Sequence, residues 1–544
     1  MNIKRLAKAV FKLLPEFIQT PLRRAFAGHG ITPARAKRAA KKDLVTVADT
    51  ADLAAGAGAG AGAGRAAVSQ PVPEPEAAAR LPAPRGHLDM VIRCPDDSVI
   101  VVGWALPSGS PLLMVEGAGT TACLTDSFSS YRPDLTGPFG GEFGPMAAYG
   151  GFILRLPRQT TAPASVALSL ASSGRIIHSV KAEQIGAQPI ELARRLFSVD
   201  TPPHLLTERF STTDLPAIAA AMKENERIVE TYPVERWQFG EAPVAPATSL
   251  IIPLYARWDF VEHQLLAFSR DADILSRCEI IYVVDDPNIL PHFLAQAREL
   301  SELYGVAFTI VWGQVNRGYA GANNLGAGQA RGDKLILMNS DVIPDAPGWA
   351  ATLTDLLDAN PGFGVIAPRL MFPDGGIQHA GMAFQWDARL QVWLNDHPLL
   401  GLPREADPTV GLSERQAVTG ACMVLRRREF EELGRFDTGY LIGDFEDSDL
   451  CLKYRERGLL PGYCADVELT HLERQSLRSA GDPGFRQKVT ILNAVRHQER
   501  WGATIARLAG GGLTSGGLAG GGLAGAGLKG GRLLGQDDGK ENRP

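Results

Sequence analysis

The sequence predicts an α/β protein with a mostly parallel sheet and flanking helices, a small β-sandwich on its amino-terminal side, and disordered tails. Three observations predict this organisation. Strand-like and helix-like runs alternate from about residue 247, short β-rich runs recur between residues 87 and 188, and stretches rich in Gly, Ala and Pro flank these parts. A chain of 544 residues is long enough for about two to four domains.

Residues 1–50 are predicted to form a basic amphipathic segment. Ile3, Leu6 and Val10 recur at helical spacing with lysines between them. Residues 1–42 contain eleven basic side chains and one acid, a net charge of +10 in a chain of net charge −5, so the remainder carries −15. The segment could contact an anionic membrane peripherally, or be a solvated tail or docking helix, whereas the acidic remainder argues against nucleic acid as a partner.

Two low-complexity stretches are predicted to lack packed structure. Residues 51–86 are rich in Ala, Gly and Pro and should form a flexible linker, and residues 506–544 should form a Gly-rich disordered tail. The six cysteines contain no C-x-x-C pair, which indicates reduced, mostly buried thiols. No secretory signal or membrane span is recognisable, so we expect a cytoplasmic protein, or one held peripherally on the inner face of the plasma membrane.

Residues 87–188 are predicted to form the β-sandwich module, because their short apolar runs are broken regularly by Gly, Pro, Asp and Ser. We expect this module to fold alone, followed by a helical bridge at 189–246. Four of its side chains could line a sugar-binding face, or could instead be core and corner residues: Trp104, Tyr131, Arg132 and Phe152.

Residues 247–505 are predicted to form the parallel-sheet domain. Strands are expected at SLIIPL, EIIYVV, FTIVW and KLILM, and helices at FVEHQLLAFSR, at PHFLAQARELSELYG and from Gly321 to Ala330. In such sheets, ligands bind at the carboxyl ends of the strands. The residues that follow each strand are therefore the candidates for a functional site.

The first three strand ends carry few specific signals. The turn after the first strand has no glycine, which argues against a dinucleotide-binding fold and a P-loop kinase. Asp285 and Asp286 follow the second strand and could accept hydrogen bonds from a ribose or base, or be turn residues. Asn316 and Arg317 follow the third strand and offer donors before a helix that could face an anion or simply be capped.

Acidic residues and a histidine mark the later strand ends. Asn339 and Asp341 follow the fourth strand, where oxygen ligands could hold a divalent cation that bridges two phosphates. Farther on, Glu446 and Asp447 belong to an acidic group at a helix start, where they could cap the helix or provide a general base. His471 lies beyond another strand and could complete a metal site or be structural.

Taken together, these motifs resemble, in order and spacing, those of the inverting family-two glycosyltransferases with the GT-A fold. The resemblance covers about residues 247 to 475 and rests on the motifs PLYARWDF, IYVVDDP, NRGYAGANNLG, NSD, DGGIQHAGM, VTGACMVLRR, GDFEDSDLCL and THLERQS. It implies a nucleotide-diphosphate sugar donor, a glycan or lipid-linked acceptor, transfer with inversion, and a divalent cation, Mg²⁺ or Mn²⁺. A role in cell-surface polysaccharide assembly would fit.

The resemblance also implies roles for individual residues. Tyr255 and Asp285 resemble the base and ribose contacts, and Asp341 and His471 resemble the metal ligands. Asp447 resembles the catalytic base, with Glu446 as its alternate. The remaining residues expected to bind the donor lie in the same motifs: Asp286, Asn316, Arg317, Asn323 and Asn339.

Two departures from the family pattern limit these expectations. Asn339 stands where the metal motif has an acid, which leaves Asp341 as the main ligand. Gln498, Arg500 and Trp501 are one residue short of the Q-x-x-R-W motif of polymerising relatives, so we expect transfer of a single sugar or a short chain. A non-catalytic glycan- or nucleotide-binding protein is the alternative, whereas a sugar nucleotidyltransferase should have a Gly-rich basic loop after the first strand, which is missing.

Overall fold

The computed structural model describes residues 82–106, 112–114, 122–124, 127–157, 165–170, 175–472 and 483–510. The predicted basic segment at 1–50 lies outside these residues, as do most of the predicted linker and tail. The linker prediction extends too far, because strand β1 begins at Arg85. The tail prediction begins too early, because helix α15 continues to Gly510. No helix in the described ranges is both long and apolar enough to cross a membrane.

The residues of the β-module form two sheets that share a core. The first has the order β5-β6-β2-β1-β9 and the second the order β4-β3-β7-β8. Leu88, Val101 and Phe152 of the first sheet and Val166 and Leu168 of the second belong to one apolar cluster. The strands are β1 Arg85–Arg93, β2 Val99–Leu106, β3 Leu112–Met114, β4 Ala122–Cys123, β5 Phe128–Ser130, β6 Gly151–Leu156, β7 Ser165–Leu170, β8 Ile176–Lys181 and β9 Glu183–Gln184.

The predicted helical bridge at 189–246 is helical only in its first part. It contains α5 Pro189–Phe197, α6 Leu206–Arg209 and α7 Leu215–Val229. The sequence ERWQF then forms strand β10, Glu235–Phe239, which pairs antiparallel with β13. Its alternation of polar and apolar side chains fits an edge strand, so the prediction of helix is wrong for this part of the bridge.

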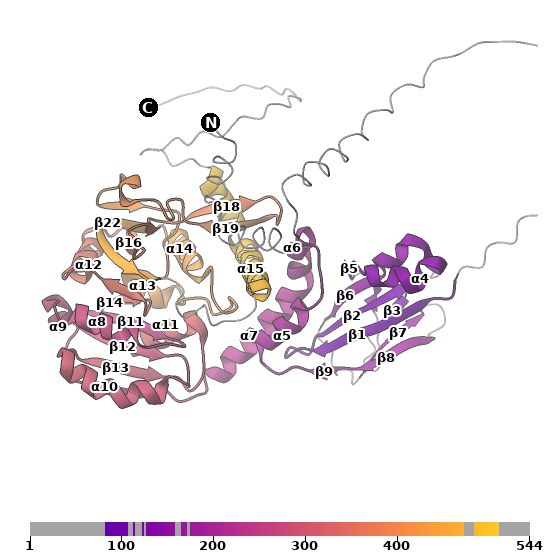
Figure 1. The fold of residues 1–544 in the computed structure, drawn as a ribbon, viewed down its shortest axis with the longest axis horizontal. Helices are drawn as coiled ribbons and strands as arrows, with labels where there is room; N and C mark the ends of the chain where they lie inside the picture. The colour runs from indigo at the N-terminus through magenta and orange to yellow at the C-terminus, as the bar shows by residue number, and fades with distance from the viewer. Residues whose placement is uncertain are drawn as a thin grey trace, which may run out of the picture. The chain divides into compact units, whose positions relative to one another are not determined.

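The larger sheet has the predicted parallel core and an antiparallel extension (Figure 1). Its order is β10-β13-β12-β11-β14-β21-β16-β22-β15, with β11, β12, β13 and β14 parallel to their neighbours in that core. The four predicted strands are confirmed as β11 Thr248–Leu254, β12 Cys278–Val284, β13 Phe308–Trp312 and β14 Lys334–Met338. The other strands are β15 Val342–Pro344, β16 Phe363–Met371, β21 Cys422–Arg426 and β22 Leu460–His471, with β17 Ile377–His379 and β20 Leu412–Glu414 paired at the side.

Helices bury both faces of this sheet, which explains why its strands read as continuous apolar runs. Leu250 and Ile252 pack with α8 Phe260–Phe268, α9 Ala272–Arg277, α10 Leu290–Tyr304 and α12 Trp349–Ala359. Ile251, which points to the other face, packs with α11 Gly318–Gln329, α14 Glu446–Glu456 and α15 Pro483–Gly510. Further elements of this domain are helix α13 Arg427–Glu432 and the hairpin of β18 Ala383–Asp387 and β19 Val392–Asp396, which lies beside α15 (Figure 1).

Another apolar cluster joins the β-module to the rest of the chain. It contains Ile100 and Ile153 from the module, Phe210 from the bridge, and Tyr440 and Val495 from the α/β domain. An isolated module would expose its part of this cluster to water. The premise that few contacts cross the module boundary is therefore wrong, and independent folding of residues 87–188 would have to overcome that exposure.

Candidate active site

The carboxylates of Asp285 and Asp286, which follow the second predicted strand, join it to the ends of the first and third strands. Asp285 is 4% exposed, and its Oδ1 accepts a hydrogen bond from the backbone nitrogen of Arg317 at 2.7 Å. Asp286 accepts from the backbone nitrogen of Ala256 at 3.2 Å, next to the exposed Tyr255. Burial raises the pKa of Asp285 to about 8, against the opposing effect of the backbone donors of Arg317 and Gly318.

Side chains at the start of helix α11 form hydrogen bonds with the backbone of the chain itself. Arg317 donates through Nη2 to the carbonyls of Val229 and Gly313, both at 3.1 Å. These two hydrogen bonds hold its guanidinium group against the backbone. Asn316 accepts from the nitrogen of Gly318 at 3.0 Å and stabilises the turn into the helix. Asn323 is fully buried and donates to the Tyr319 carbonyl at 2.9 Å. This arrangement gives no support to donor contacts by the side chains of Arg317 or Asn323.

The fourth strand end brings Asp341 and His471 together. Nε2 of His471 lies 3.2 Å from Oδ1 of Asp341, and their side chains are 7% and 9% exposed, respectively. His471 is the last residue of β22 rather than a residue beyond it, and it pairs with Val342 of β15. The 3.2 Å contact is outside hydrogen-bond geometry, so both ring nitrogens are buried without a hydrogen-bond partner among the described residues.

A carboxylate beside an imidazole with two unsatisfied nitrogens is a donor set that fits a divalent cation. The described residues contain no group of three or more His, Cys, Asp or Glu side chains that could hold a metal. A cation at Asp341 and His471 would therefore need its other ligands from a substrate and water. The backbone of Asn339 is held in place here, because its nitrogen donates to the Ala421 carbonyl at 2.9 Å.

Gln264 is a residue that the sequence reasoning missed. It is fully buried on α8, and its Nε2 donates to the carbonyls of Asn339 at 3.1 Å and Val342 at 3.0 Å. These two bonds fix the turn that carries Asp341. A polar side chain on the apolar face of FVEHQLLAF was the available signal.

A sharp turn at Gly420 connects this edge of the sheet to the acidic helix. Its nitrogen donates to Oδ2 of Asp447 at 2.9 Å, and its carbonyl accepts from the Tyr319 hydroxyl. A Cβ on Gly420 would lie 2.8 Å from that hydroxyl and 3.3 Å from the Cβ of Asp447. Since the neighbouring Ala421 binds Asn339, the turn brings the helix start to the end of β14.

The two candidate bases have different pKa values. Burial raises the pKa of Asp447 to about 6, while the backbone donors of Gly420 and Ser448 limit the rise. Burial, together with the charge of Asp447, raises the pKa of Glu446 well above its ordinary range, and its Oε2 has no hydrogen-bond partner in the structure. At neutral pH Asp447 is therefore mostly ionised, whereas Glu446 tends to keep its proton. Of the two, Asp447 is the one able to accept a proton.

Asp449 in the same acidic motif is structural. It is fully buried, and its Oδ1 accepts from the Tyr440 hydroxyl at 3.0 Å and from Nε1 of Trp501 at 2.7 Å. Nη1 of Arg500 lies 2.9 Å from the same oxygen. Gln498 accepts from the nitrogen of Trp393 at 3.1 Å. The Gln498, Arg500 and Trp501 group thus holds α14 and the β18–β19 hairpin against α15.

Arg257 is a second missed residue. It pairs with Asp259, and this pairing is the largest cause of a raised guanidinium pKa, to which the charge of Asp341 also contributes. The residue is partly exposed and follows β11 by three positions. It places a cation near the Asp341 end of the site, which suits a diphosphate.

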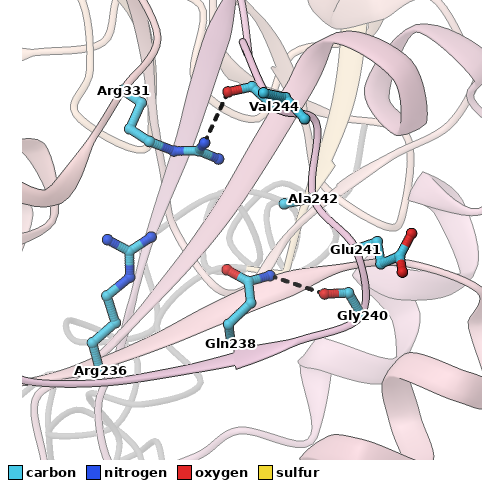
Figure 2. Close-up of a pocket in the computed structure, with 7 residues that line it drawn as sticks. All are labelled: Arg236, Gln238, Gly240, Glu241, Ala242, Val244 and Arg331. Atoms are coloured by element: carbon cyan, nitrogen blue, oxygen red, sulfur yellow. Dashed lines mark hydrogen bonds between the residues drawn. The ribbon is translucent and has the colours of Figure 1, made fainter.

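A separate hollow of about 470 Å³ lies at the opposite edge of the sheet (Figure 2). Arg331 donates to the Val244 carbonyl at 3.1 Å there, and Gln238 donates to the Gly240 carbonyl at 3.4 Å. Arg331 and Val244 precede strands β14 and β11, so the hollow is at the amino ends of the strands. Parallel sheets bind ligands at the carboxyl ends, and we therefore place the candidate site at Asp341 and Asp447.

Comparison with known proteins identifies a family for part of the α/β domain. The model of the family described as glycosyl transferase family 2 matches residues 249–434. An uncharacterized protein, y4gI, of Sinorhizobium fredii is 36% identical over 191 residues, which cover 34% of this chain and 20% of that protein. The O-antigen biosynthesis protein RfbC of Myxococcus xanthus is 32% identical over 170 residues, 30% of this chain and 13% of that protein.

An N-acetylglucosaminyl-diphospho-decaprenol L-rhamnosyltransferase of Mycobacterium tuberculosis is 28% identical over 188 residues, 32% of this chain and 59% of that enzyme. The chain thus spans less than two thirds of each of these relatives. A crystal structure of GalNAc-T7 with UDP, GalNAc and Mn²⁺ overlaps 42% of this chain and 44% of that one, at 18% identity and a TM-score of 0.34. The mannosyltransferase PcManGT from Pyrobaculum calidifontis, in complex with GDP-Man and Mn²⁺, overlaps 58% of this chain and 88% of that one, at 16% identity and a TM-score of 0.31.

Overlaps at these TM-scores carry no functional argument, and the assignment rests on the sequence family. The matched segment contains the core strands β11 to β14 and the Gly420 turn, whereas Asp447 and His471 follow it. Residues 249–434 form a glycosyltransferase domain of family 2, and their α/β architecture has the mostly parallel sheet core that the sequence predicts.

Proposed function

We propose that this chain transfers a sugar from a nucleotide-diphosphate donor to a glycan or lipid-linked acceptor, with inversion at the anomeric carbon. The observation that carries the proposal is the Gly420 turn. It connects Asp447, which is mostly ionised at neutral pH, to the strand end that carries Asp341 and His471. A proton acceptor and a diphosphate site on one sheet edge are what such a transfer needs.

The donor would be held at the first, second and fourth strand ends. Tyr255 and Asp285 would contact the base and ribose, with Asp286 fixing the backbone at Ala256. Asp341 and His471 would hold a divalent cation, Mg²⁺ or Mn²⁺, and Arg257 would approach the diphosphate from the exposed side. When bound, the cation would neutralise the charge that the diphosphate gains as it leaves.

Asp447 would act on the acceptor. Its carboxylate accepts the proton of an acceptor hydroxyl while that oxygen forms a bond to the anomeric carbon and the bond to the diphosphate breaks on the opposite face. One displacement inverts the configuration. The hydrogen bonds from Gly420 and Ser448 hold the carboxylate in place and leave each oxygen a further lone pair for the proton.

The names of the relatives support a place in cell-surface polysaccharide assembly, since one acts in O-antigen biosynthesis and another is a rhamnosyltransferase with a lipid-linked acceptor. On this basis we also propose that the acceptor is a glycan or is lipid-linked, and that the protein acts at the cytoplasmic face of the plasma membrane. Transfer of a single sugar or short chain is part of the proposal. It is supported by the structural task of Gln498 and Trp501, which hold other elements.

The test measures release of nucleotide diphosphate from the full chain with Mn²⁺ or Mg²⁺, across UDP-, GDP- and dTDP-sugars and lipid-linked and glycan acceptors. Acceptor-dependent release with one donor, abolished by chelation of the metal, is expected. Thermal stabilisation by a nucleotide-sugar without any release would favour the alternative, a nucleotide-binding protein that has kept the fold.

A further inference from the structure

An exposed group of aromatic and charged side chains lies on the β-module, apart from the candidate active site. We call it the Tyr131 patch and define it by Asp89, Tyr131, Arg132, Asp134, Met146 and Tyr149. Tyr131, Met146 and Tyr149 are 45%, 69% and 58% exposed, and the two tyrosine rings are 5.4 Å apart. Neighbouring large apolar side chains on a soluble surface often mark a binding site.

The chain builds this patch from two segments that the backbone ties together. Tyr131 follows β5, and Tyr149 ends a short helical turn at Gly144–Tyr149. The nitrogen of Arg132 donates to the Ala148 carbonyl at 2.7 Å, which places the two tyrosines side by side. The rings are therefore positioned by main-chain bonds, and the two tyrosines belong to none of the apolar clusters of the fold.

Gly151 makes room for the charged half of the patch. A Cβ at this position would lie 2.6 Å from Cγ of Arg132 and 2.4 Å from the Ser130 carbonyl oxygen. Without a side chain there, Arg132 can reach across the sheet to β1. Its Nη1 lies 2.6 Å from Oδ2 of Asp89, and its Nη2 lies 2.8 Å from Oδ2 of Asp134.

The charges of the patch select among ligands. One guanidinium between two carboxylates leaves a net charge of −1 from Asp89, Arg132 and Asp134, which argues against an anionic lipid surface or nucleic acid. Carboxylate and guanidinium groups in a fixed array bind hydroxyl groups well. Tyrosine rings with exposed faces offer apolar contact to the C–H faces of pyranose rings.

We propose that the Tyr131 patch binds a neutral pyranose glycan. The two tyrosine rings stack on sugar rings, and Asp89, Arg132 and Asp134 bind hydroxyl groups at their edge. Of the other side chains considered from the sequence, Phe152 is in the core and Trp104 packs on Phe139 at 5.0 Å. None of these residues belongs to the proposed binding site for the nucleotide-sugar donor. The glycan-binding proposal can therefore be tested separately from the proposed transferase activity.

The test uses the full chain on an array of neutral hexopyranose and 6-deoxyhexopyranose oligosaccharides, with affinities measured for the glycans that bind. We expect Tyr131→Ala combined with Tyr149→Ala to weaken binding at least about fivefold, the size of loss typical of a central aromatic contact. Tyr131→Phe and Tyr149→Phe keep the rings and should bind nearly as the wild type does. Tyr232→Ala is the matched control, because Tyr232 is 39% exposed and lies in the bridge.

Three outcomes would overturn the proposal: no glycan bound by the wild type, equal binding by the double alanine variant, or a preference for anionic phosphatidylglycerol vesicles that depends on the patch. Thermal unfolding of each variant separates a lost contact from a lost fold, and the single variants Tyr131→Ala and Tyr149→Ala, each of which removes one ring, decide the question if the double variant does not fold. Asp447→Asn should leave glycan binding unchanged. Binding that persists when turnover is absent would keep this site even if the transferase proposal failed.

Discussion

Replacing Asp447 by Asn tests the assignment of the base directly. Asn has nearly the same shape but cannot take a proton from an acceptor hydroxyl. The variant should lower turnover by about 10²-fold or more, which corresponds to about 2.7 kcal/mol of barrier, while donor affinity stays close to that of the wild type. The reason is that the proposed donor contacts lie on other strand ends, at Tyr255, Asp285 and Asp341.

The structure also indicates how Asp447→Asn should change stability. The folded-state pKa of Asp447, about 6, lies above its unfolded value, so ionisation of this half-buried carboxyl group destabilises the fold. This cost is absent below about pH 4, grows as pH rises through 6, and reaches about 3 kcal/mol at pH 7. Asn removes this cost, but its single side-chain oxygen can accept a hydrogen bond from only one of the backbone nitrogens of Gly420 and Ser448. Leaving the other nitrogen without a partner lowers the stability of the fold by about 1 to 3 kcal/mol. The two effects largely cancel, so the melting temperature should change little.

The assay is the pH dependence of kcat/KM for nucleotide diphosphate release. In the wild type, kcat/KM should be constant above pH 7 and fall about tenfold per pH unit below the pKa of Asp447, near 6. The Asn variant should show a low rate without this acid limb. Asp449→Asn is the matched control: it disturbs a fully buried acid that holds Tyr440 and Trp501, and it should lower stability by about 3 kcal/mol.

Near-normal turnover of Asp447→Asn would refute the assignment. If Glu446→Gln then abolished turnover, the base would be Glu446, despite the raised pKa that favours its protonated form. If neither variant mattered, the acidic motif would not perform glycosyl transfer. An acid limb that survives in Asp447→Asn would assign the pKa near 6 to another group.

Three other predictions concern the metal, the packing of α11 and the amino-terminal segment. Asp341→Ala should abolish Mn²⁺-dependent thermal stabilisation by the correct nucleotide-sugar, which for the wild type is about 2.7 kcal/mol at 100 times the dissociation constant; an unchanged shift would remove Asp341 from the metal site. Gly326→Ala should lower the free energy of unfolding, measured with denaturant, by about 1 to 3 kcal/mol, because its Cβ would lie 2.5 Å from Cγ2 of Ile251. Gly328→Ala should raise it by about 0.5 to 1 kcal/mol, because its Cβ would meet only Arg435, at 3.6 Å. Equal effects of the two substitutions would contradict this packing argument. Removing residues 1–42 should reduce sedimentation with anionic vesicles and leave activity intact, and unchanged vesicle binding would exclude the basic segment as the contact.

The sequence predicts the parallel core of the sheet well because each of these strands is a short continuous run of apolar residues. Both faces of β11 and β12 are buried, so their residues form apolar runs that are recognisable without any knowledge of the fold. The acids that follow these strands lie at one edge because parallel strands end together. Strand β10 was missed because an edge strand such as ERWQF buries only part of its side chains and pairs with a partner some 70 residues away.

Side-chain direction was not predictable from residue type. Arg317 suggested a ligand for phosphate, yet its guanidinium binds the carbonyls of Val229 and Gly313, and it is its backbone nitrogen that reaches Asp285. Asn323 looked like a donor contact in its motif, but the helix turns it into the core. The role of Gln264 was not predictable, because its two partners are backbone atoms 75 and 78 positions away. For Arg317 and Gln264, contacts with residues far away in the sequence decide the role.

Helix α15 shows why the parts of this chain depend on one another. At Trp501 it holds Asp449, two positions from the proposed base, and at Val495 it belongs to the apolar cluster that includes Ile153 of the β-module. A change that loosens this cluster can therefore reach the start of α14 through one rigid helix, without any contact to the active site. The β-module thus contributes to the packing behind the acidic motif, which gives a physical reason for the two to be encoded in one chain.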